Sequence, residues 1–356
     1  MSFLNIIYFL LLLSLIIIIH EAGHFIAAKM FGVYCYEFSF GMGPCIFKKK
    51  GKETQFSIRA LPIGGFVAMA GELDGDEAYP DVEVPEGRRL IDKKPWQKII
   101  IMLAGVFNNF VLAFVIISFV TLSQGTYVSS PKAIVNSVVE GSPAEKAGFQ
   151  AGDVIKKITK EDGSSVEPDT YMDMQVFTTN YSGVETYTLD RNGEEVTISV
   201  QTEYNEEEEI YYIGIMAPTP EETKVNLLNC WYYGALQMVQ LTKFMLTAIV
   251  NLFTGVGLEQ LSGPVGIYEA AGQYAALGFS AFMFLVAELS LNVGIFNLLP
   301  LPILDGGQVV VTVIEWIVHR PLNEKVKTGI MIACWVLMIG LMVFVTWNDI
   351  ARLLIK

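Results

Sequence analysis

The sequence has few charged residues. Asp, Glu, Lys and Arg make up 17% of the 356 residues and apolar types 52%, whereas a soluble domain carries about 25% charged residues. We therefore expect much of the chain to lie in lipid. Acidic residues outnumber basic ones and give a net charge of −13. This charge argues against nucleic acid as a partner, because nucleic-acid-binding proteins need basic surfaces.

Cysteine and histidine are also scarce. The four cysteines form no CxxC pair and no zinc-knuckle spacing, so we predict packed or free thiols at Cys35, Cys45, Cys230 and Cys334. The chain has only three histidines, yet two of them fall within one five-residue motif. No internal repeat stands out, which counts against a transporter, because transporters usually show paired or inverted repeats.

Four apolar stretches are long enough to cross a bilayer as helices, which takes about 20 residues. The first stretch has no basic n-region, no clear cleavage site and too long an apolar run for a signal peptide, so we expect it to stay as a span. The predicted spans are residues 1–30, 99–124, 275–310 and 328–348.

Three further regions separate these spans. Residues 31–98 alternate β-formers with glycines, which predicts short strands and turns in a membrane-associated loop region. Residues 126–217 are soluble in character and predict an inserted α+β domain. Residues 225–258 are apolar but contain Asn, Gln and Lys, which predicts an amphipathic helix on the membrane surface. The fold class is therefore a multi-pass α-helical membrane protein with four spans, a β-loop region and an inserted domain.

Basic residues indicate the orientation. The segment Lys93-Lys-Pro-Trp-Gln-Lys98 precedes the second span, and the loop around Arg320 is also basic, so both are predicted to be cytoplasmic. The inserted domain is then extracytoplasmic, and the polar ends of the first and third spans lie at the same depth. This agreement would be lost if residues 225–258 also crossed, so we expect them not to cross.

The motif His20-Glu-Ala-Gly-His24 predicts a metal site. Residues i and i+4 of a helix point the same way, so both imidazoles can bind one ion, and we predict one Zn²⁺ per chain. Glu21 can take a proton from the attacking water and pass it to the leaving amine, while zinc acidifies this water and polarises the scissile carbonyl. Ionisable groups inside a span are functional by default. A chance match, or two histidines at a helix contact, is the weaker interpretation.

A catalytic zinc needs a third protein ligand. His319 lies in a basic loop and is typical of a surface histidine, while Glu37 follows glycine and β-formers and fits poorly. The better candidate is Asp305. It follows two prolines that must interrupt the helix, and such a break is tolerated in a membrane only beside protein or water. Asp305 can also serve as a helix N-cap, and the two roles are compatible.

Together these residues resemble the site-2 protease family of intramembrane zinc metalloproteases, most closely its RseP-type bacterial members. The resemblance covers nearly the whole chain. It rests on HEAGH at 20–24, Ile63-Gly-Gly-Phe-Val67, Ser262-Gly-Pro-Val265, the segment Asn297-Leu-Leu-Pro-Leu-Pro-Ile-Leu-Asp-Gly-Gly307, and a PDZ-like pattern in residues 126–217.

The resemblance implies regulated intramembrane proteolysis. The substrates would be single-span proteins of the bacterial cytoplasmic membrane, such as trimmed anti-sigma factors or signal-peptide remnants, whose outer domains another protease has already trimmed. The resemblance also implies two substrate-binding segments. They are Asn297, Pro300 and Pro302, which would help hold the substrate strand, and Gly64, Gly65, Phe66 and Val67, which would offer it a strand edge.

Three features depart from the family pattern. One PDZ-like domain is present where some members have two. The second span contains Ala104-Gly-Val-Phe-Asn-Asn109 where the family often has proline after Ala-Gly, which leaves the contribution of Asn108 and Asn109 to substrate contact open. Glu288 lies inside the third span, where a structural or pore-facing role outweighs a catalytic one.

The PDZ-like domain allows two roles. The segment Tyr212-Ile-Gly-Ile215 resembles a PDZ strand-edge loop, which either binds a trimmed chain end or obstructs bulky substrates. No basic residue lies beside it to attract a carboxylate, and this favours obstruction. Two other functions stay as alternatives to a protease: a membrane PDZ scaffold with a non-catalytic metal site, and a metal transporter. The intact HExxH motif and the third carboxylate argue against the scaffold.

Overall fold

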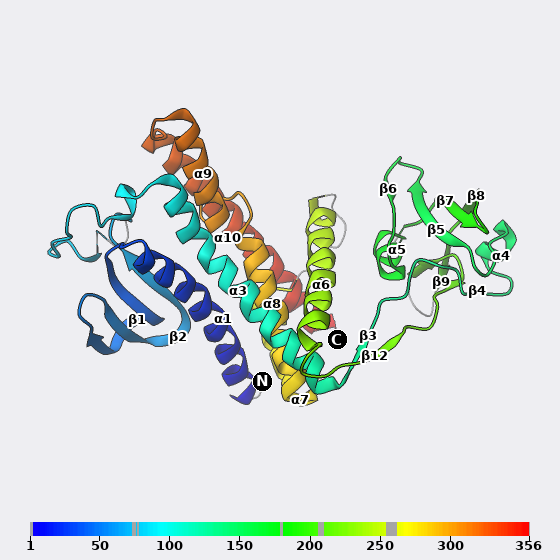
Figure 1. The fold of residues 1–356 in the computed structure, drawn as a ribbon, viewed down its shortest axis with the longest axis horizontal. Helices are drawn as coiled ribbons and strands as arrows, with labels where there is room; N and C mark the ends of the chain where they lie inside the picture. Colours follow the sequence, from blue (N-terminus) through cyan, green and yellow to red (C-terminus); the bar gives the residue numbers. More distant parts are fainter. Residues whose placement is uncertain are drawn as a thin grey trace. The chain divides into compact units, whose positions relative to one another are not determined.

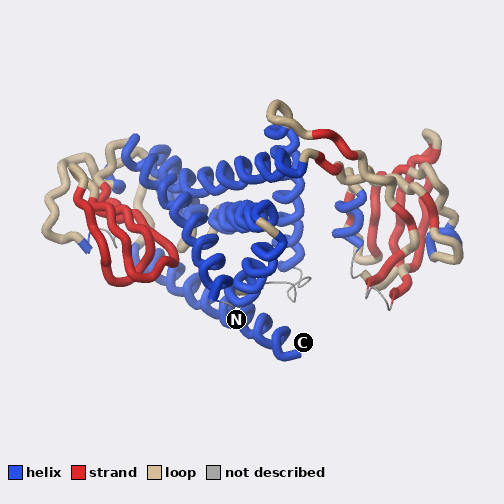
Figure 2. Tube along the Cα trace, turned by 90° about the horizontal axis from the view of Figure 1, so that it is seen from below, coloured by secondary structure: helices blue, strands red, loops and turns tan. Residues whose placement is uncertain are grey.

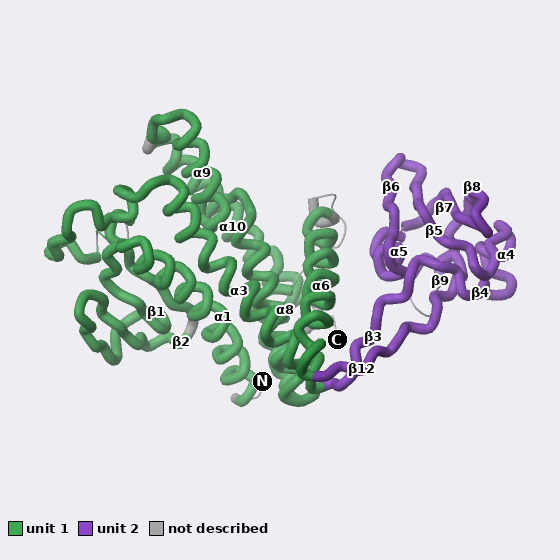
Figure 3. Tube along the Cα trace, viewed as in Figure 1, with its two compact units in different colours: residues 1–123, 227–356 green, residues 124–226 purple. Residues whose placement is uncertain are grey.

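The computed structural model describes residues 3–72, 76, 78–178, 181–205, 210–253 and 262–355. The chain forms two compact units, which Figure 3 shows in green and purple. Unit 1 comprises Met1–Ser123 and Leu227–Lys356, and unit 2 comprises Gln124–Asn226. Unit 2 is therefore inserted as one block into the sequence of unit 1.

Unit 1 is built mainly from helices (Figure 1). In chain order they are α1 (Phe3–Met30), α3 (Pro95–Gln124), α6 (Cys230–Phe253), α7 (Pro264–Leu277), α8 (Phe279–Asn297), α9 (Asp305–Val318) and α10 (Glu324–Ile355), with a 3₁₀ turn at Leu90–Asp92. Among the described residues, α1, α3, α8 and α10 are long and apolar enough to cross a membrane. All four cysteines are free, as predicted.

The region expected as one span at 275–310 contains more than one helix. Gly278, with φ +117°, separates α7 from α8, and residues 298–304 separate α8 from α9. Two prolines explain the second break, since a helix interior cannot accommodate them. The break lets Asp305 begin a new helix at the end of the third candidate span.

Helices α1, α3 and α8 share one apolar core. It includes Leu12 and Ile16 of α1, Ile117 of α3 and Leu291 of α8, each at most 1% exposed. Helix α6 adds Met245 to this core. The α6 segment is not among the four candidate spans, and its position relative to the membrane stays a prediction; residues 254–258 of the predicted surface helix lie outside the described residues.

A small sheet lies against α1 (Figure 2, strands at the left). It consists of β1 (Cys35–Lys50) and β2 (Gln55–Met69), longer strands than the short ones expected. The register explains the difference, because Phe38 pairs with both Phe56 and Val67. Each strand folds over at glycines with left-handed φ, Gly41 at +83° and Gly64 at +85°. Four paired segments result, with residues 65–69 at the edge of the sheet.

Unit 2 is an α+β fold. Its strands and helices are β3 (Thr126–Val128), β4 (Ser137–Val138), α4 (Pro143–Ala147), β5 (Val154–Lys160), β6 (Ser165–Val166), α5 (Tyr171–Thr178), β7 (Val184–Arg191), β8 (Glu194–Gln201), β9 (Glu203–Asn205), β10 (Ile210–Tyr212), β11 (Ile215–Met216) and β12 (Glu222–Lys224). The main sheet has the order β6-β5-β7-β8. Alternate residues of β7, including Tyr187 and Leu189, are fully buried, as a strand with one face on a core requires. Strands β3 and β12 pair where the chain leaves and re-enters unit 1.

A buried ion pair ties the end of β7 to the turn before β5. Arg191 Nε donates to Asp153 Oδ1 and Arg191 Nη2 donates to Oδ2, each at 2.7 Å, and the Asp153 side chain is fully buried. Burial alone would raise the pKa of Asp153, but hydrogen bonds from Arg191 and from the Gln150 N–H outweigh it, so the pKa is lowered. The pair therefore stabilises unit 2 above the unfolded-state pKa of Asp, about 3.9, and this contribution is lost as the pH falls through the lower folded-state pKa.

Replacement Arg191→Ala should destabilise unit 2 by about 3 kcal/mol at pH 7, because it leaves a buried carboxylate without its charge partner. The loss should shrink as the pH falls below about 3.9, the unfolded-state pKa of Asp, and on through the lower folded-state pKa of Asp153. Pulse proteolysis of the full-length chain in urea measures it. The control is Lys156→Ala, which removes an exposed pair with Asp190 at 3.8 Å and should cost under about 1 kcal/mol. Equal losses in the two variants would contradict the prediction.

Candidate active site

Helix α1 presents His20 and His24 one turn apart on the side that faces α3. Glycines permit this contact: a Cβ added to Gly23 would lie 2.2 Å from the Ala104 carbonyl oxygen. A Cβ added to Gly105 would lie 2.4 Å from His24 Nε2. Small residues that let backbones approach closely are the usual means of helix association in lipid. Both imidazoles are thus enclosed, each residue being 8% exposed.

Asp305 reaches the histidines from the start of α9. Residue Leu304, with φ −107° and ψ 162°, is the N-cap, so Asp305 is the first helical residue and the N-cap alternative does not apply. The two glycines that follow are required by packing. A Cβ on Gly306 would lie 2.3 Å from the Leu298 carbonyl oxygen, and one on Gly307 would lie 2.0 Å from that of Leu301. The 298–304 segment therefore folds back tightly on the helix it precedes.

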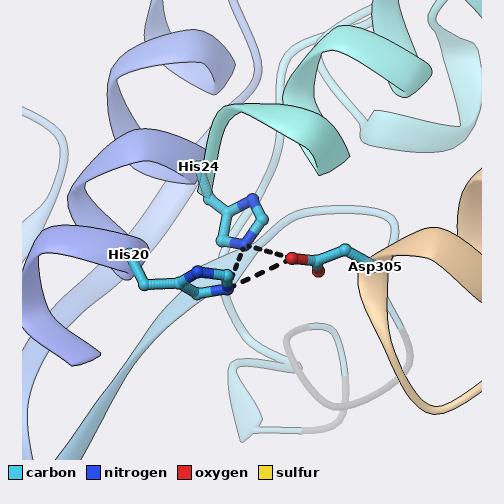
Figure 4. Close-up of side chains that lie close together, drawn as sticks. All are labelled: His20, His24 and Asp305. Carbon is cyan, nitrogen blue, oxygen red and sulfur yellow. Dashed lines mark hydrogen bonds and ion pairs between the residues drawn. The ribbon is translucent and has the colours of Figure 1, made fainter. Parts of the chain in front are cut away.

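Three potential ligand atoms converge (Figure 4). His20 Nε2 lies 3.1 Å from His24 Nε2 and 3.1 Å from Asp305 Oδ2, and His24 Nε2 lies 3.5 Å from the same oxygen. Zinc bonds of about 2.0–2.1 Å in tetrahedral geometry place ligand atoms roughly 3.3 Å apart. Asp305 Oδ2 is also buried without a hydrogen-bond partner. The two histidines and the aspartate therefore fit a three-ligand zinc site.

Glu21 lies between this site and the edge of the β sheet. The backbone N–H of Val67 lies near the Glu21 carboxylate. A Cβ added to Gly65 would lie 3.9 Å from Glu21 Cγ. The edge segment thus runs beside the proposed general base, and backbone can approach it at Gly65 without a side chain intervening. The substrate-binding role expected for Gly64, Gly65, Phe66 and Val67 stays a prediction.

The other predicted substrate residues lie in the segment before Asp305. Asn297 is the last residue of α8, and Pro300 and Pro302 lie in the 298–304 break. Gln308 Nε2 donates to the Pro302 carbonyl at 2.7 Å, which fixes part of this segment. Their contact with substrate is untested.

Two rejected ligands have other partners. Glu37 is fully buried and accepts hydrogen bonds from Ser57, Tyr79 and Arg59. Burial alone would raise its pKa, but these bonds lower it. His319 ends α9 with φ +55°, and its Nδ1 contacts the Ile317 carbonyl at 2.9 Å.

The structure adds two residues to the site that the motifs did not assign. Asn108 donates to the Ile19 carbonyl at 3.1 Å, and the Asn109 amide contacts His20 Nδ1 at 3.2 Å. Both contacts join α3 to α1 next to His20. The available signal was two adjacent amides within an otherwise apolar span.

Comparison with known proteins agrees with this geometry. A family model described as peptidase family M50 matches residues 8–341. The chain belongs to peptidase family M50. This membership confirms the resemblance to site-2 proteases that the motifs indicated.

Named relatives extend over nearly the whole chain. A putative zinc metalloprotease of Clostridium perfringens is 36% identical, over 97% of this chain and 98% of that protein. The zinc metalloprotease RasP of Shouchella clausii is 30% identical over 97% and 98%. The regulator of sigma-W protease RasP of Bacillus subtilis is 31% identical over 98% and 99%. This M50 peptidase is a zinc metalloprotease.

Solved structures resemble a smaller part of the chain. The PDZ domain of an SdrC-like protein from Listeria monocytogenes matches 26% of this chain and 92% of that structure, with 17% identity and a TM-score of 0.21. The corresponding domain from Listeria innocua matches 24% and 92%, with 22% identity and a TM-score of 0.20.

Replacement Gly105→Ala should lower zinc affinity at least about tenfold, because the added methyl displaces both imidazoles from positions that suit one ion. Competition with a chromogenic chelator measures this. The control is Gly340→Ala in α10, where an added Cβ meets nothing within 4 Å and alanine favours the helix by about 1 kcal/mol. Wild-type zinc affinity in the Gly105 variant would show that α3 does not limit the position of the rings.

Proposed function

We propose that this M50 peptidase cleaves the transmembrane segments of single-span membrane proteins. One observation carries the proposal: the two histidines and Glu21 lie within α1, a candidate membrane span whose most apolar 18-residue stretch has a mean hydropathy of 2.3. Ionisable side chains inside a membrane span cost free energy, so they are found there chiefly where they serve a function. A peptidase of water-soluble substrates has no need to keep its ligands on such a helix.

The proposed chemistry uses four residues of this chain. His20, His24 and Asp305 hold the zinc, which when bound polarises the scissile carbonyl and acidifies the attacking water. Glu21 accepts the proton of that water and delivers it to the leaving amide nitrogen as the C–N bond breaks. The Val67 N–H, which lies near the Glu21 carboxylate, can orient that carboxylate between transfers.

We infer that the substrate enters as an unwound strand. A peptide bond inside a helix is shielded by its own hydrogen bonds, so the helix must open before attack. The 65–69 segment pairs with β1 on one side only among the described residues, and its other edge runs beside Glu21. A substrate strand added there would present its carbonyl to the metal ligands, with Asn297, Pro300 and Pro302 on the approach from α8.

The proposed location is the bacterial cytoplasmic membrane. Lys93, Lys94 and Lys98 at the start of α3 support a cytoplasmic position for that end, by the positive-inside rule. The metal ligands then lie towards the cytoplasm, and unit 2, which follows the other end of α3, lies outside. We assign unit 2 as a PDZ-like domain, because its segment Ser142–Ile155 forms a capped short helix, a turn and a strand.

The proposed substrates are proteins whose outer domains have already been trimmed by another protease. A relative is named a regulator of sigma-W protease, which supports a signalling substrate such as a trimmed anti-sigma factor. Signal-peptide remnants have the same chemistry, an apolar helix with a short outer end, and are the second substrate class.

Replacement Glu21→Gln should retain about one zinc per chain and lower cleavage of a single-span substrate at least about a hundredfold, because the amide cannot take up the proton. Metal analysis and a gel-based cleavage assay measure the two effects. His24→Ala and Asp305→Ala serve as comparison, since both should lose zinc as well as activity. Full cleavage by Glu21→Gln would falsify the proposed mechanism.

Deletion of residues 131–217, with the ends joined by a flexible linker, should leave zinc content and cleavage of a trimmed substrate intact. The paired strands β3 and β12 remain and keep the new ends close together. The variant should also cut the untrimmed form of that substrate, which the intact protein should refuse. If it still refuses the untrimmed form and cuts the trimmed one poorly, unit 2 recruits substrate and does not act as a steric filter.

A further inference from the structure

Asn109 is a polar residue in the interior of an apolar helix bundle. It is fully buried in α3, its side-chain amide lies 3.2 Å from His20 Nδ1, and its Oδ1 has no hydrogen-bond partner. Its backbone is held separately, since Ser290 of α8 donates to the Asn109 carbonyl at 3.0 Å. A buried polar atom without a partner is rare in folded proteins and calls for a functional explanation.

The tautomer that His20 needs in order to bind a metal through Nε2 supplies that explanation. A histidine that binds metal through Nε2 carries its proton on Nδ1, which is then a donor. The amide presents either its NH₂ group or its oxygen to this nitrogen, because a half-turn of the side chain exchanges the two. In either orientation, one end of the Asn109 amide has no partner among the described contacts. The protonation of His20 Nδ1 therefore decides which end faces the ring. Only the oxygen can accept from Nδ1–H.

We propose that Asn109 is the positioning residue for His20. Its side-chain oxygen accepts the Nδ1 proton, which fixes the ring in the tautomer that leaves Nε2 free for zinc. The amide also sets the rotation of the ring about its Cβ–Cγ bond. The inference rests on the zinc site and does not depend on the nature of the protein substrate.

The second histidine provides an internal comparison. His24 Nδ1 lies 2.8 Å from the carbonyl oxygen of Ile101, two turns earlier on α3. That carbonyl can only accept, so it selects the same tautomer for His24 through the backbone. Helix α3 thus orients both imidazoles, one through a backbone oxygen and one through a side chain. Only the second can be removed by substitution.

The test compares Asn109→Leu with Asn109→Asp in the full-length chain. Leucine matches asparagine in size but cannot accept the proton, so zinc affinity should fall about tenfold to a hundredfold, the usual range for loss of such a partner. Aspartate accepts it and should bind zinc within about threefold of the wild type. Competition with a chromogenic chelator gives the affinities. Thr121→Val, which removes a buried hydroxyl of the same helix that contacts Gln237 Oε1 at 2.9 Å, is the control and should keep wild-type affinity.

Two further readouts separate positioning from a merely structural role. In excess chelator, Asn109→Leu should unfold at the wild-type temperature or above it, because it replaces a half-satisfied polar group with an apolar one. With only three histidines in the chain, ¹⁵N-histidine spectra of the zinc-loaded protein can be assigned by single substitutions. The His20 Nδ1–H signal should be protected from exchange in the wild type and Asn109→Asp, and shift upfield in Asn109→Leu.

Wild-type zinc affinity in Asn109→Leu would overturn the proposal. Asn109→Asp binding zinc as weakly as Asn109→Leu would overturn it too, since it would show that any change at this position disturbs packing. Neither result would bear on whether the protein cuts within the membrane, because zinc affinity is measured without a substrate.

Discussion

The contact between α1 and α3 is the constraint on which the site depends. At Gly23 and Gly105 the two helices approach so closely that a methyl group on either would overlap its neighbour. In lipid, where apolar surface gains little from burial between helices, such backbone proximity is a main source of attraction. The same proximity confines two imidazoles in a small space and brings the Asn109 amide close to His20 and the Ile101 carbonyl close to His24.

The third candidate ligand, Asp305, depends instead on a break between two helices. Helix α8 ends at Asn297, and the prolines prevent it from continuing. The chain then turns back within seven residues and begins α9 at Asp305, with Gly306 and Gly307 packed on the turn. Rigid helices therefore hold the histidines, and a compact turn delivers the carboxylate. Both arrangements restrict the motion of the three side chains. A metal site needs such restriction for high affinity.

The convergence of His20, His24 and Asp305, the candidate metal ligands, could be predicted from sequence because the rules involved are local. Spacing of four residues on a helix, and two prolines before a carboxylate, are visible without any knowledge of packing. The contact between Asn109 and His20 could not be predicted, because the two residues lie 89 positions apart in the sequence. In addition, a helix that is apolar all round has no polar–apolar periodicity to show which face packs against a neighbouring helix. The folded sheet was missed for a related reason, since the double pairing of Phe38 is a matter of long-range register.

The separation of the ligands along the chain also has a consequence for biosynthesis. His20 and His24 are synthesised before unit 2, whereas Asp305 follows unit 2 and, among the described residues, helices α6, α7 and α8. Two histidines alone do not make a catalytic zinc site, which takes three protein ligands. A nascent chain that has not yet reached Asp305 therefore lacks the third candidate ligand. The order of residues in the sequence therefore delays completion of the three-residue cluster until unit 2 has been synthesised.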